Sequence, residues 1–326
     1  MNGNEPAPAG AVRTGLLSVI LLSYRSGERL RTAHAKLAAL LGAAGIPFEL
    51  VIMDDGSPDQ SYAIACELEK AHANVFAYRL SRNCTSHYSI FAGLSVCRGD
   101  CAAPIPDDEQ QPYELLVDMY RRWQAGSQVI VPHRSIRADP PVSRWFSQAY
   151  YGLMNRFSEV KYPEGGADLF FIDREVIDVL NQRIHPIRTA SIAEVLRLGF
   201  DPVFLPFERP AGLNRGTSRW TFRKKLRLAA DTFLSSSAFP IKLIVMLGFA
   251  SSSLALAAMV FYFSAGLLGD RWPLADKFPR GWISLVLLIS FFSGTILLSL
   301  GVLAEYVWRI YEEVKNRPGF IVRKKG

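Results

Sequence analysis

Apolar runs of strand length alternate with helix-length segments along the first two thirds of the chain. The helical periodicity is clearest in Glu28–Leu41, where Leu30, Ala33, Leu37 and Leu41 recur on one face. Strands that alternate with helices at this spacing predict an α/β fold, with a mostly parallel sheet and helices on both of its faces. The predicted strands are Leu16–Ser23, Phe48–Asp54, Asn74–Leu80, Cys101–Ile105, Gln128–Pro132, Asp168–Ile172 and Val203–Phe207, and the predicted helices are Glu28–Leu41, Pro58–Ala71, Tyr88–Val96, Tyr113–Trp123, Ser143–Phe157 and Ala190–Leu198.

Two long uncharged segments follow in the last third of the chain. Neither Leu243–Leu268 nor Trp282–Ala304 contains Asp, Glu, Lys, Arg or His, and each is longer than the roughly 20 residues that cross a bilayer core. We therefore predict two transmembrane helices. Before them, Thr221–Ser237 begins cationic and ends apolar, which is typical of an interfacial helix; an ordinary amphipathic surface helix is the alternative. The expected organisation is a flexible N-terminus (1–14), a main domain (15–220), an interfacial helix (221–240), two spans (241–268 and 282–307) joined by an external loop (269–281), and a basic tail (308–326).

The distribution of charge predicts the orientation of these spans. The chain of 326 residues is 49% hydrophobic, with a mean hydropathy of +0.12 and a formal net charge of +7. Basic residues crowd the outer flanks of the two spans, whereas the loop 269–281 holds only Arg271, Lys277 and Arg280. The positive-inside rule then places both termini in the cytoplasm. The same crowding favours anionic lipid head groups, and not nucleic acid, as the partner of the positive charge.

The N-terminal residues and the cysteines indicate neither a cleaved signal nor a metal or disulfide site. Residues 1–14 lack the apolar region and cleavage site of a secretory signal. The four cysteines show no zinc-finger spacing, so we expect reduced packing residues in a cytoplasmic domain. They are Cys66, Cys84, Cys97 and Cys101.

Acidic clusters follow two of the predicted strands. The sequence Asp54-Asp55-Gly56-Ser57 ends one strand, and Asp107-Asp108-Glu109-Gln110 follows another. Ligands of open α/β sheets bind at the carboxyl ends of the strands, where the two clusters would converge. Such carboxylates can accept hydrogen bonds from a nucleobase or ribose, or hold Mg²⁺ or Mn²⁺ that is shared with substrate phosphates and acts as a Lewis acid. Ordinary Asp-Gly turns and a solvated, N-capping acidic turn are the alternatives.

Two further clusters lie in the second half of the main domain. Gly165-Gly166-Ala167-Asp168 precedes a predicted strand, and a lone Asp in that position is usually a turn residue. The loop Asn214–Trp220 combines two arginines, a glycine and two hydroxyl groups, which suits a phosphate cradle. A generic basic loop next to the membrane is the alternative for this segment.

These clusters, taken in order, resemble glycosyltransferase family 2. Within it the chain is similar to the polyisoprenyl-phosphate glycosyltransferases, such as dolichol-phosphate mannose synthase and the bactoprenol glucosyltransferases. The resemblance extends from Leu16 to about Arg309 and includes the paired apolar segments. It rests on Asp54-Asp55-Gly56-Ser57, Arg82-Asn83, Asp108-Glu109-Gln110, Asp168 and Gly216-Thr217-Ser218-Arg219-Trp220.

The resemblance implies a GT-A catalytic domain that transfers a sugar, with inversion, from a nucleotide-sugar to a polyprenyl phosphate. A UDP-sugar and undecaprenyl phosphate are the favoured substrates, the cytoplasmic face of the inner membrane is the implied location, and the product would be a lipid-linked sugar for cell-envelope glycan modification. The family also implies a homo-oligomer, a tetramer. The implied site residues are Asp54, Asp55, Ser57, Arg82 and Asp107 for the nucleotide-sugar, Asp108, Asp168 and Arg215 for catalysis, Asp108 and Gln110 for Mg²⁺ or Mn²⁺, and Arg134, Arg215, Ser218 and Arg219 for the acceptor phosphate.

The chain departs from the family pattern at several positions. Pro106 occupies the first Asp position of the metal-binding Asp-Ala-Asp-Leu-Gln motif, and Asp107 is a displaced substitute. The arginine of the family's Gly-Asp-Phe-Arg is absent after Asp168, Cys84 replaces a common glycine, and Tyr24-Arg25-Ser26 replaces Tyr-Asn-Glu. Two other functions therefore stay open, namely a family 2 transferase with another acceptor and a non-catalytic membrane scaffold. The first of these is disfavoured in its processive form, because no Gln precedes Arg219-Trp220 at the required spacing.

Overall fold

The computed structural model divides the chain into two compact units, 1–236 with 318–326, and 237–317. The first is called the sheet unit below, and the second the apolar unit. The structure describes residues 13–108, 111–134, 169–184, 190–207, 282–315 and 318–323, together with 163, 167, 186, 244, 246–250, 253, 257 and 260.

A seven-stranded sheet forms the centre of the sheet unit, in the order β3-β2-β1-β4-β6-β5-β7. Four of its strand pairs are parallel, and β6 runs antiparallel to both of its neighbours. The predicted mostly parallel α/β sheet is therefore confirmed. The strands are β1 (Leu17–Ser23), β2 (Phe48–Asp54), β3 (Val75–Arg79), β4 (Cys101–Pro106), β5 (Val129–Arg134), β6 (Phe171–Asp173) and β7 (Pro202–Phe207).

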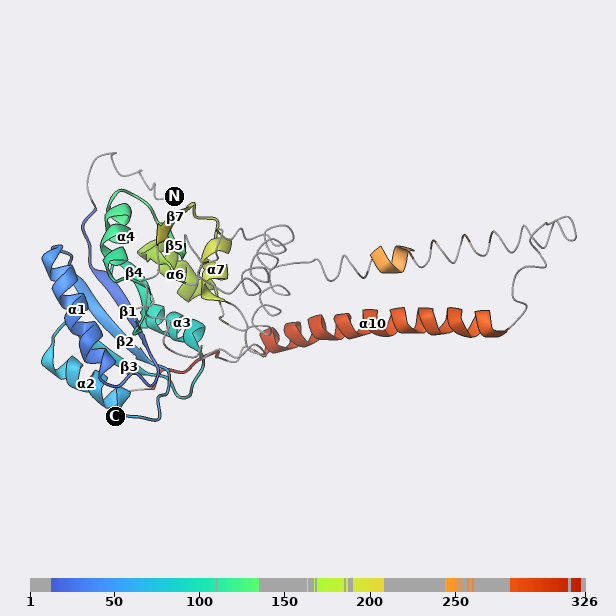
Figure 1. Cartoon of the computed structure of the whole chain (residues 1–326), viewed down its shortest axis with the longest axis horizontal. Helices are drawn as coiled ribbons and strands as arrows, with labels where there is room; N and C mark the ends of the chain where they lie inside the picture. Colours follow the sequence, from blue (N-terminus) through green and yellow to red (C-terminus); the bar gives the residue numbers. More distant parts are fainter. Residues whose placement is uncertain are drawn as a thin grey trace, which may run out of the picture. The chain divides into compact units, whose positions relative to one another are not determined.

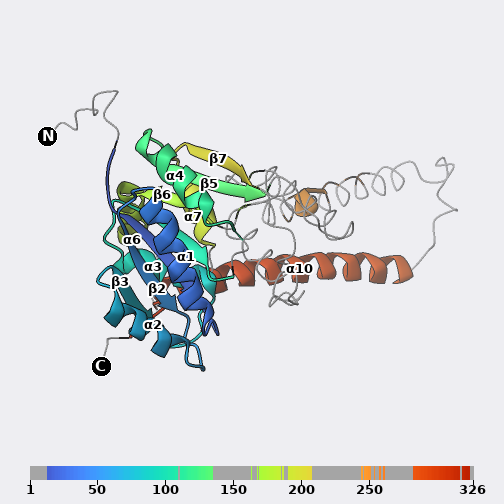
Figure 2. The same cartoon turned by 60° about the vertical axis from the view of Figure 1, so that its left-hand side comes forward.

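Helices cover both faces of this sheet (Figures 1 and 2). Successive residues of a strand point to opposite faces, so Leu17, Val19 and Leu21 of β1 enter one core cluster and Ile20 enters the other. The first cluster includes side chains of α1 (Arg29–Ala43), α2 (Ser61–Ala71) and α4 (Glu114–Gln124), and the second includes side chains of α3 (Ser86–Val96), α6 (Arg174–Arg183) and α7 (Ser191–Arg197). The central strands are buried on both faces, which explains why they read as continuous apolar runs.

Some predicted boundaries are wrong. The helix after β2 begins at Ser61 and not at Pro58, because the Asp59 carboxylate accepts hydrogen bonds from the backbone N (3.1 Å) and Oγ (2.6 Å) of Ser61. The strand predicted from Asp168 begins only at Phe171, and the unpredicted helix α6 follows it. Asp173 ends this strand and caps α6 by accepting a hydrogen bond from the backbone N of Glu175 (3.0 Å).

Other predictions lie outside the described residues. These are the helices Ser143–Phe157 and Thr221–Ser237, and most of the predicted first span, 241–268. Of the four cysteines, Cys84, Cys97 and Cys101 are buried, and all four are free thiols. Burial raises the pKa of these three buried thiols, as expected of packing residues.

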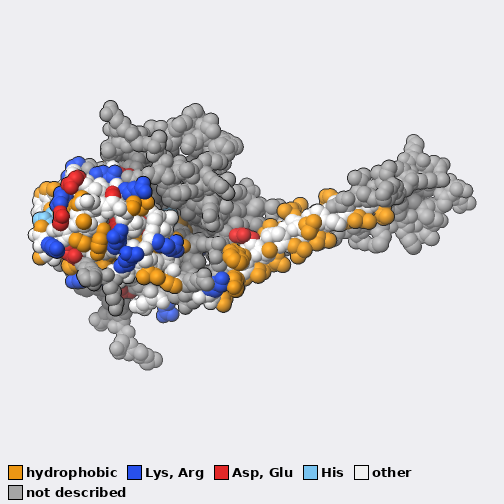
Figure 3. Space-filling view, turned by 90° about the horizontal axis from the view of Figure 1, so that it is seen from below, with side chains coloured by type: hydrophobic (Ala, Val, Ile, Leu, Met, Phe, Trp, Pro, Cys, Tyr) orange, Lys and Arg blue, Asp and Glu red, His pale blue; other side chains and the backbone are white. Residues whose placement is uncertain are grey.

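The apolar unit contains one long helix, α10 (Trp282–Val314), within its described residues. At 1.5 Å per residue its 33 residues extend about 50 Å. Its segment Phe291–Trp308 is long and apolar enough to cross a membrane, and hydrophobic side chains are exposed along it (Figure 3). Near the end of α10, the Lys315 Nζ lies 4.1 Å from the ring centroid of Tyr311 and 5.9 Å from that of Trp308. Aromatic and cationic side chains of this kind are typical of a membrane boundary.

Candidate functional site

The two acidic clusters meet at one edge of the sheet. Asp54 ends β2 opposite Ser23, and Pro106 ends β4 opposite Leu22, so the clusters lie on either side of the end of β1. Two strand spacings separate them by roughly 10 Å. The predicted convergence is confirmed. Arg134 ends β5 at the same edge, because β4 and β5 are both antiparallel to β6; its side chain is outside the described residues.

Asp54 is fully buried at this edge. Its Oδ2 accepts a hydrogen bond from the backbone N of Ser57 (3.1 Å) and forms an ion pair with the Nε of Arg79 (3.2 Å). Its Oδ1 is buried and has no hydrogen-bond partner among the described residues. Burial raises the pKa of the Asp54 carboxyl, although the bonds from Ser57 and the charge of Arg79 oppose this shift. Asp54 therefore offers one unsatisfied acceptor.

Asp55 connects the end of β2 to the loop after β3. Its carboxylate accepts hydrogen bonds from the backbone N of Cys84 (2.6 Å) and of Thr85 (3.0 Å), and its own backbone N donates to the carbonyl of Ser23 (2.8 Å). Burial raises the pKa of this carboxyl to about 6, while the two backbone hydrogen bonds act in the opposite direction. Both oxygens of Asp55 therefore hold the protein's own backbone.

The turn after Asp55 packs directly on that loop. Gly56 has a φ of +64°, and a Cβ at this position would lie 2.7 Å from the carbonyl carbon of Arg82. Thr85 has a φ of +84°, a strained value for a residue with a side chain. Ser57 is buried, and its Oγ accepts a hydrogen bond from the backbone N of Arg25 (3.0 Å), another residue with positive φ (+52°). Strained backbone of this kind clusters at functional sites.

The second acidic cluster contains an ion pair that the sequence did not reveal. Asp107 is buried, and its Oδ2 accepts a hydrogen bond from the Nε of Arg29 (3.0 Å), on the first turn of α1, and forms an ion pair with the Nη2 of the same guanidinium (2.8 Å). The Nη2 of Arg29 also donates to the carbonyl of Arg25 (3.1 Å). The guanidinium of Arg29 thus already neutralises the carboxylate that we considered as a substitute for the missing first Asp. Asp108, the next residue, is half-buried.

The described residues supply only part of a metal site. Among them, no group of three or more His, Cys, Asp or Glu side chains could hold a metal ion. Asp108 is described, whereas Glu109, Gln110 and Asp168 lie outside the described residues. Mg²⁺ is often held by one or two carboxylates, with substrate phosphates and water as its other ligands. One carboxylate at the carboxyl edge fits that mode of binding.

The remaining predicted site residues are only partly placed. Arg82 is exposed beside Asp55, and its charge lowers the pKa of that carboxyl. Arg215, Ser218 and Arg219, expected to bind the acceptor phosphate, lie outside the described residues. The sequence reasoning missed Arg29 and Arg79. A charged residue at the end of a buried strand could have indicated Arg79, but no local signal indicates Arg29.

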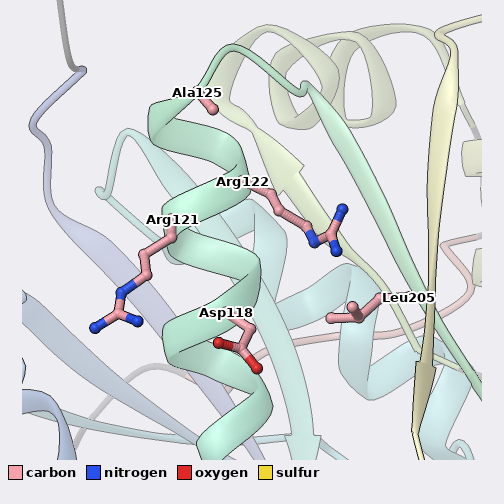
Figure 4. Close-up of a pocket in the computed structure, with 5 residues that line it drawn as sticks. All are labelled: Asp118, Arg121, Arg122, Ala125 and Leu205. Atoms are coloured by element: carbon pink, nitrogen blue, oxygen red, sulfur yellow. The ribbon is translucent and has the colours of Figure 1, made fainter.

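A separate shallow pocket of about 410 Å³ lies between α4 and β7 (Figure 4). Because α4 runs back from the carboxyl edge, the pocket is displaced from the acidic clusters. It combines one carboxylate with two guanidinium groups, of which Arg121 points away from Leu205 in the close-up. Its lining residues are Asp118, Arg121, Arg122, Ala125 and Leu205.

The sheet unit thus combines a mixed seven-stranded α/β sheet with acidic clusters at the carboxyl ends of its strands, the edge where ligands of open α/β sheets bind. The chain matches Glycosyl transferase family 2 over residues 18–180. It is 32% identical to the SfII prophage-derived bactoprenol glucosyl transferase of Shigella flexneri, over 85% of this chain and 87% of that protein. The chain therefore belongs to glycosyltransferase family 2, and it is a glycosyltransferase.

The chain is also similar to other known proteins. The chain is 29% identical to the prophage bactoprenol glucosyl transferase homolog of Escherichia coli (strain K12), over 85% of this chain and 88% of that protein. Among solved structures, it is similar to the glucosyl-3-phosphoglycerate synthase from Mycobacterium tuberculosis in complex with UDP. That similarity has a TM-score of 0.44 and 19% identity, and it covers 68% of this chain and 78% of the other.

Proposed function

We propose that this enzyme transfers a sugar from a nucleotide-sugar to the phosphate of a polyprenyl phosphate, at the surface of a membrane. The observation that carries the proposal is that one chain combines a sheet unit that matches family 2 with an exposed apolar helix long enough to cross a bilayer. Relatives named bactoprenol glucosyl transferase align with 85% of the chain, which supports a lipid acceptor.

The donor is assigned to the carboxyl edge of the sheet. The unsatisfied Oδ1 of Asp54 is a suitable acceptor for an N–H or O–H of the nucleoside, since a buried acceptor without a partner is costly. Arg82, Asp107 and Ser57 complete the nucleotide-sugar set, with Asp55 holding the wall of the site. We favour a UDP-sugar as the donor.

A divalent cation, Mg²⁺ or Mn²⁺, fits this site with Asp108 and Gln110 as its protein ligands. When bound, it would neutralise the leaving diphosphate as a Lewis acid. Arg29 has a positioning task here, because its guanidinium holds the Asp107 carboxylate in place next to Asp108.

The acceptor needs little activation. A phosphate oxygen is anionic at neutral pH, so the protein mainly has to position it and stabilise the charge of the departing group. Arg215, Arg219, Ser218 and Arg134 are assigned to the acceptor phosphate, and Asp168 to orientation of the acceptor or the sugar. The phosphate oxygen forms a bond to the anomeric carbon as the bond to the donor diphosphate breaks. This single displacement inverts the anomeric configuration.

The chain's return to the sheet unit after α10 supports the proposed topology. Residues 318–326 belong to the same unit as the sheet, so any membrane must be crossed an even number of times between 236 and 318. If α10 crosses the membrane once, a second crossing has to return the chain, which supports the proposed two-span hairpin. The basic flanks of the two spans favour a cytoplasmic sheet unit, and the family resemblance favours the inner membrane. A homotetramer is the assembly that the family resemblance supports.

The direct test uses the purified full-length protein with a panel of labelled nucleotide-sugars and undecaprenyl phosphate. We expect a lipid-linked sugar from one donor, and Asp108→Asn should lower turnover about 10²-fold or more. Arg215→Ala should raise the KM for polyprenyl phosphate roughly 10-fold to 100-fold with little change for the donor, and Arg215→Lys should restore only part of this loss. Transfer to a non-lipid acceptor would favour a family 2 transferase with another acceptor. No turnover with any donor would favour a non-catalytic membrane scaffold.

A further inference from the structure

The chain pairs with the edge of the sheet after it leaves α10. The backbone N of Ser81 donates a hydrogen bond to the carbonyl of Ile321 (2.9 Å), and the backbone N of Arg323 donates to the carbonyl of Arg79 (2.8 Å). These bonds flank an antiparallel bridge between Leu80 and Val322. Since β3 is the last strand on its side of the sheet, the segment Pro318–Arg323, called the C-terminal strap below, pairs with the outer edge of the chain at the end of β3, over residues 79–81.

Side chains fix the strap in one position. Phe320 and Val322 are partly buried against the core cluster on the α3 side of the sheet. Gly319 is tightly enclosed, since a Cβ there would lie 2.4 Å from the carbonyl oxygen of Pro186 and 2.5 Å from the Cε1 of Tyr88. Real Cβ atoms do not approach other atoms so closely, so the strap can seat only with glycine at this position.

The segment held by the strap is the one that Asp54 and Asp55 hold from the other side. The Arg79 side chain forms the ion pair with Asp54, and the backbone N of Leu80 donates to the carbonyl of Asp54 (2.8 Å). A few residues further on, the backbone N–H groups of Cys84 and Thr85 donate to the Asp55 carboxylate. The segment 79–85 therefore lies between the strap and the two site carboxylates.

We propose that the C-terminal strap is a positioning element of the donor site. It fixes the end of β3, so that the loop 82–85 keeps the strained conformation that packs on Gly56 and bonds to Asp55. The inference rests on the proposed assignment of the donor to this edge. No atom of the strap is required to contact the donor. Since Pro318 comes only a few positions after α10 in the sequence, the donor site would be completed by a segment that is synthesised after the apolar helix.

The test compares full-length variants in detergent micelles. Gly319→Val should unseat the strap, deletion of residues 318–326 removes it, and deletion of residues 324–326 is the matched control that leaves it intact. UDP and GDP are the probes of the donor site, and the KM values for donor and polyprenyl phosphate are measured separately. Two backbone hydrogen bonds are lost, so we expect the nucleotide Kd and the donor KM to rise about 10-fold, with the acceptor KM within about 2-fold of wild type.

Amide hydrogen exchange separates positioning from general destabilisation. The amides of Ser81, Cys84 and Thr85 should exchange faster in Gly319→Val, while those of β1 and β2 keep their wild-type protection. Unchanged nucleotide affinity in both strap variants would overturn the proposal, as would a uniform loss of protection across the sheet. If the wild-type protein binds neither UDP nor GDP, the assignment of the donor fails instead, and the exchange pattern alone then decides whether the strap fixes the loop.

Discussion

The Asp55 carboxyl gives a prediction whose sign and size follow from the structure. Asp55→Asn retains the shape of the side chain and removes its titration. In the folded protein burial raises the pKa of this carboxyl from its ordinary value of 3.8 to about 6. The folded state therefore binds this proton more tightly than the unfolded state. The stability gained in this way is fully present below pH 3.8 and is lost as the pH rises through about 6.

The size of the effect comes from the same shift. One pKa unit corresponds to about 1.4 kcal/mol, so the contribution of Asp55 to the free energy of unfolding should fall by about 2 to 3 kcal/mol between pH 4 and pH 7. Asn at this position contributes no such fall. The melting temperature of Asp55→Asn relative to wild type should thus rise across this interval by roughly 5 to 10 °C, given the usual dependence for a unit of about 200 residues.

The assay is thermal unfolding of both full-length proteins at pH 4, 5.5 and 7 in one detergent. Asp59→Asn is the control, because hydrogen bonds from Ser61 lower the pKa of the Asp59 carboxyl. Its stabilising contribution is lost only as the pH falls below about 3.8, so the melting temperature of this variant relative to wild type should stay nearly constant from pH 4 to pH 7. The reasoning would be refuted if the melting temperature of Asp55→Asn relative to wild type stayed constant with pH, or if it fell towards pH 7.

Two further predictions concern the backbone and the ion pair of the site. Gly56→Ala should lower the free energy of unfolding by at least about 2 kcal/mol and raise the donor KM, because the new Cβ is strained at a positive φ and also clashes with the loop backbone. Gly45 is the control position, since it also has a positive φ (+65°) but no atom lies near the position of its Cβ. In denaturant unfolding, Gly45→Ala should therefore show only the backbone penalty. Arg29→Ala leaves the buried Asp107 carboxylate without its guanidinium partner and should lower kcat about 10-fold or more in steady-state assays. Arg31→Ala removes only exposed ion pairs and should leave kcat unchanged; equal effects at the two arginines would contradict a role for the Arg29–Asp107 pair.

The succession of strands along the chain could be predicted from local pattern. The run Phe48–Asp54 is the strand β2 with the same bounds, and the acidic clusters lie at the carboxyl edge as expected. These features depend on residues close together in the chain, since burial on both faces of a central strand dictates a continuous apolar run. The exception was α6, which starts directly after the short strand β6 and leaves no turn signal between them.

The partners within the site were decided only by the tertiary structure. Asp54 and Asp107 were both found from sequence, but the arginine that pairs with Asp107 lies 78 positions away in the chain. Arg323 and Ser81, which join the C-terminal strap to β3, are separated by 242 positions. No local periodicity records contacts across such distances. The sequence by itself determined which strand ends carry the acidic residues, whereas the packing of strands and loops decided which of their oxygens are already bonded to the protein and that the buried Oδ1 of Asp54 has no hydrogen-bond partner among the described residues.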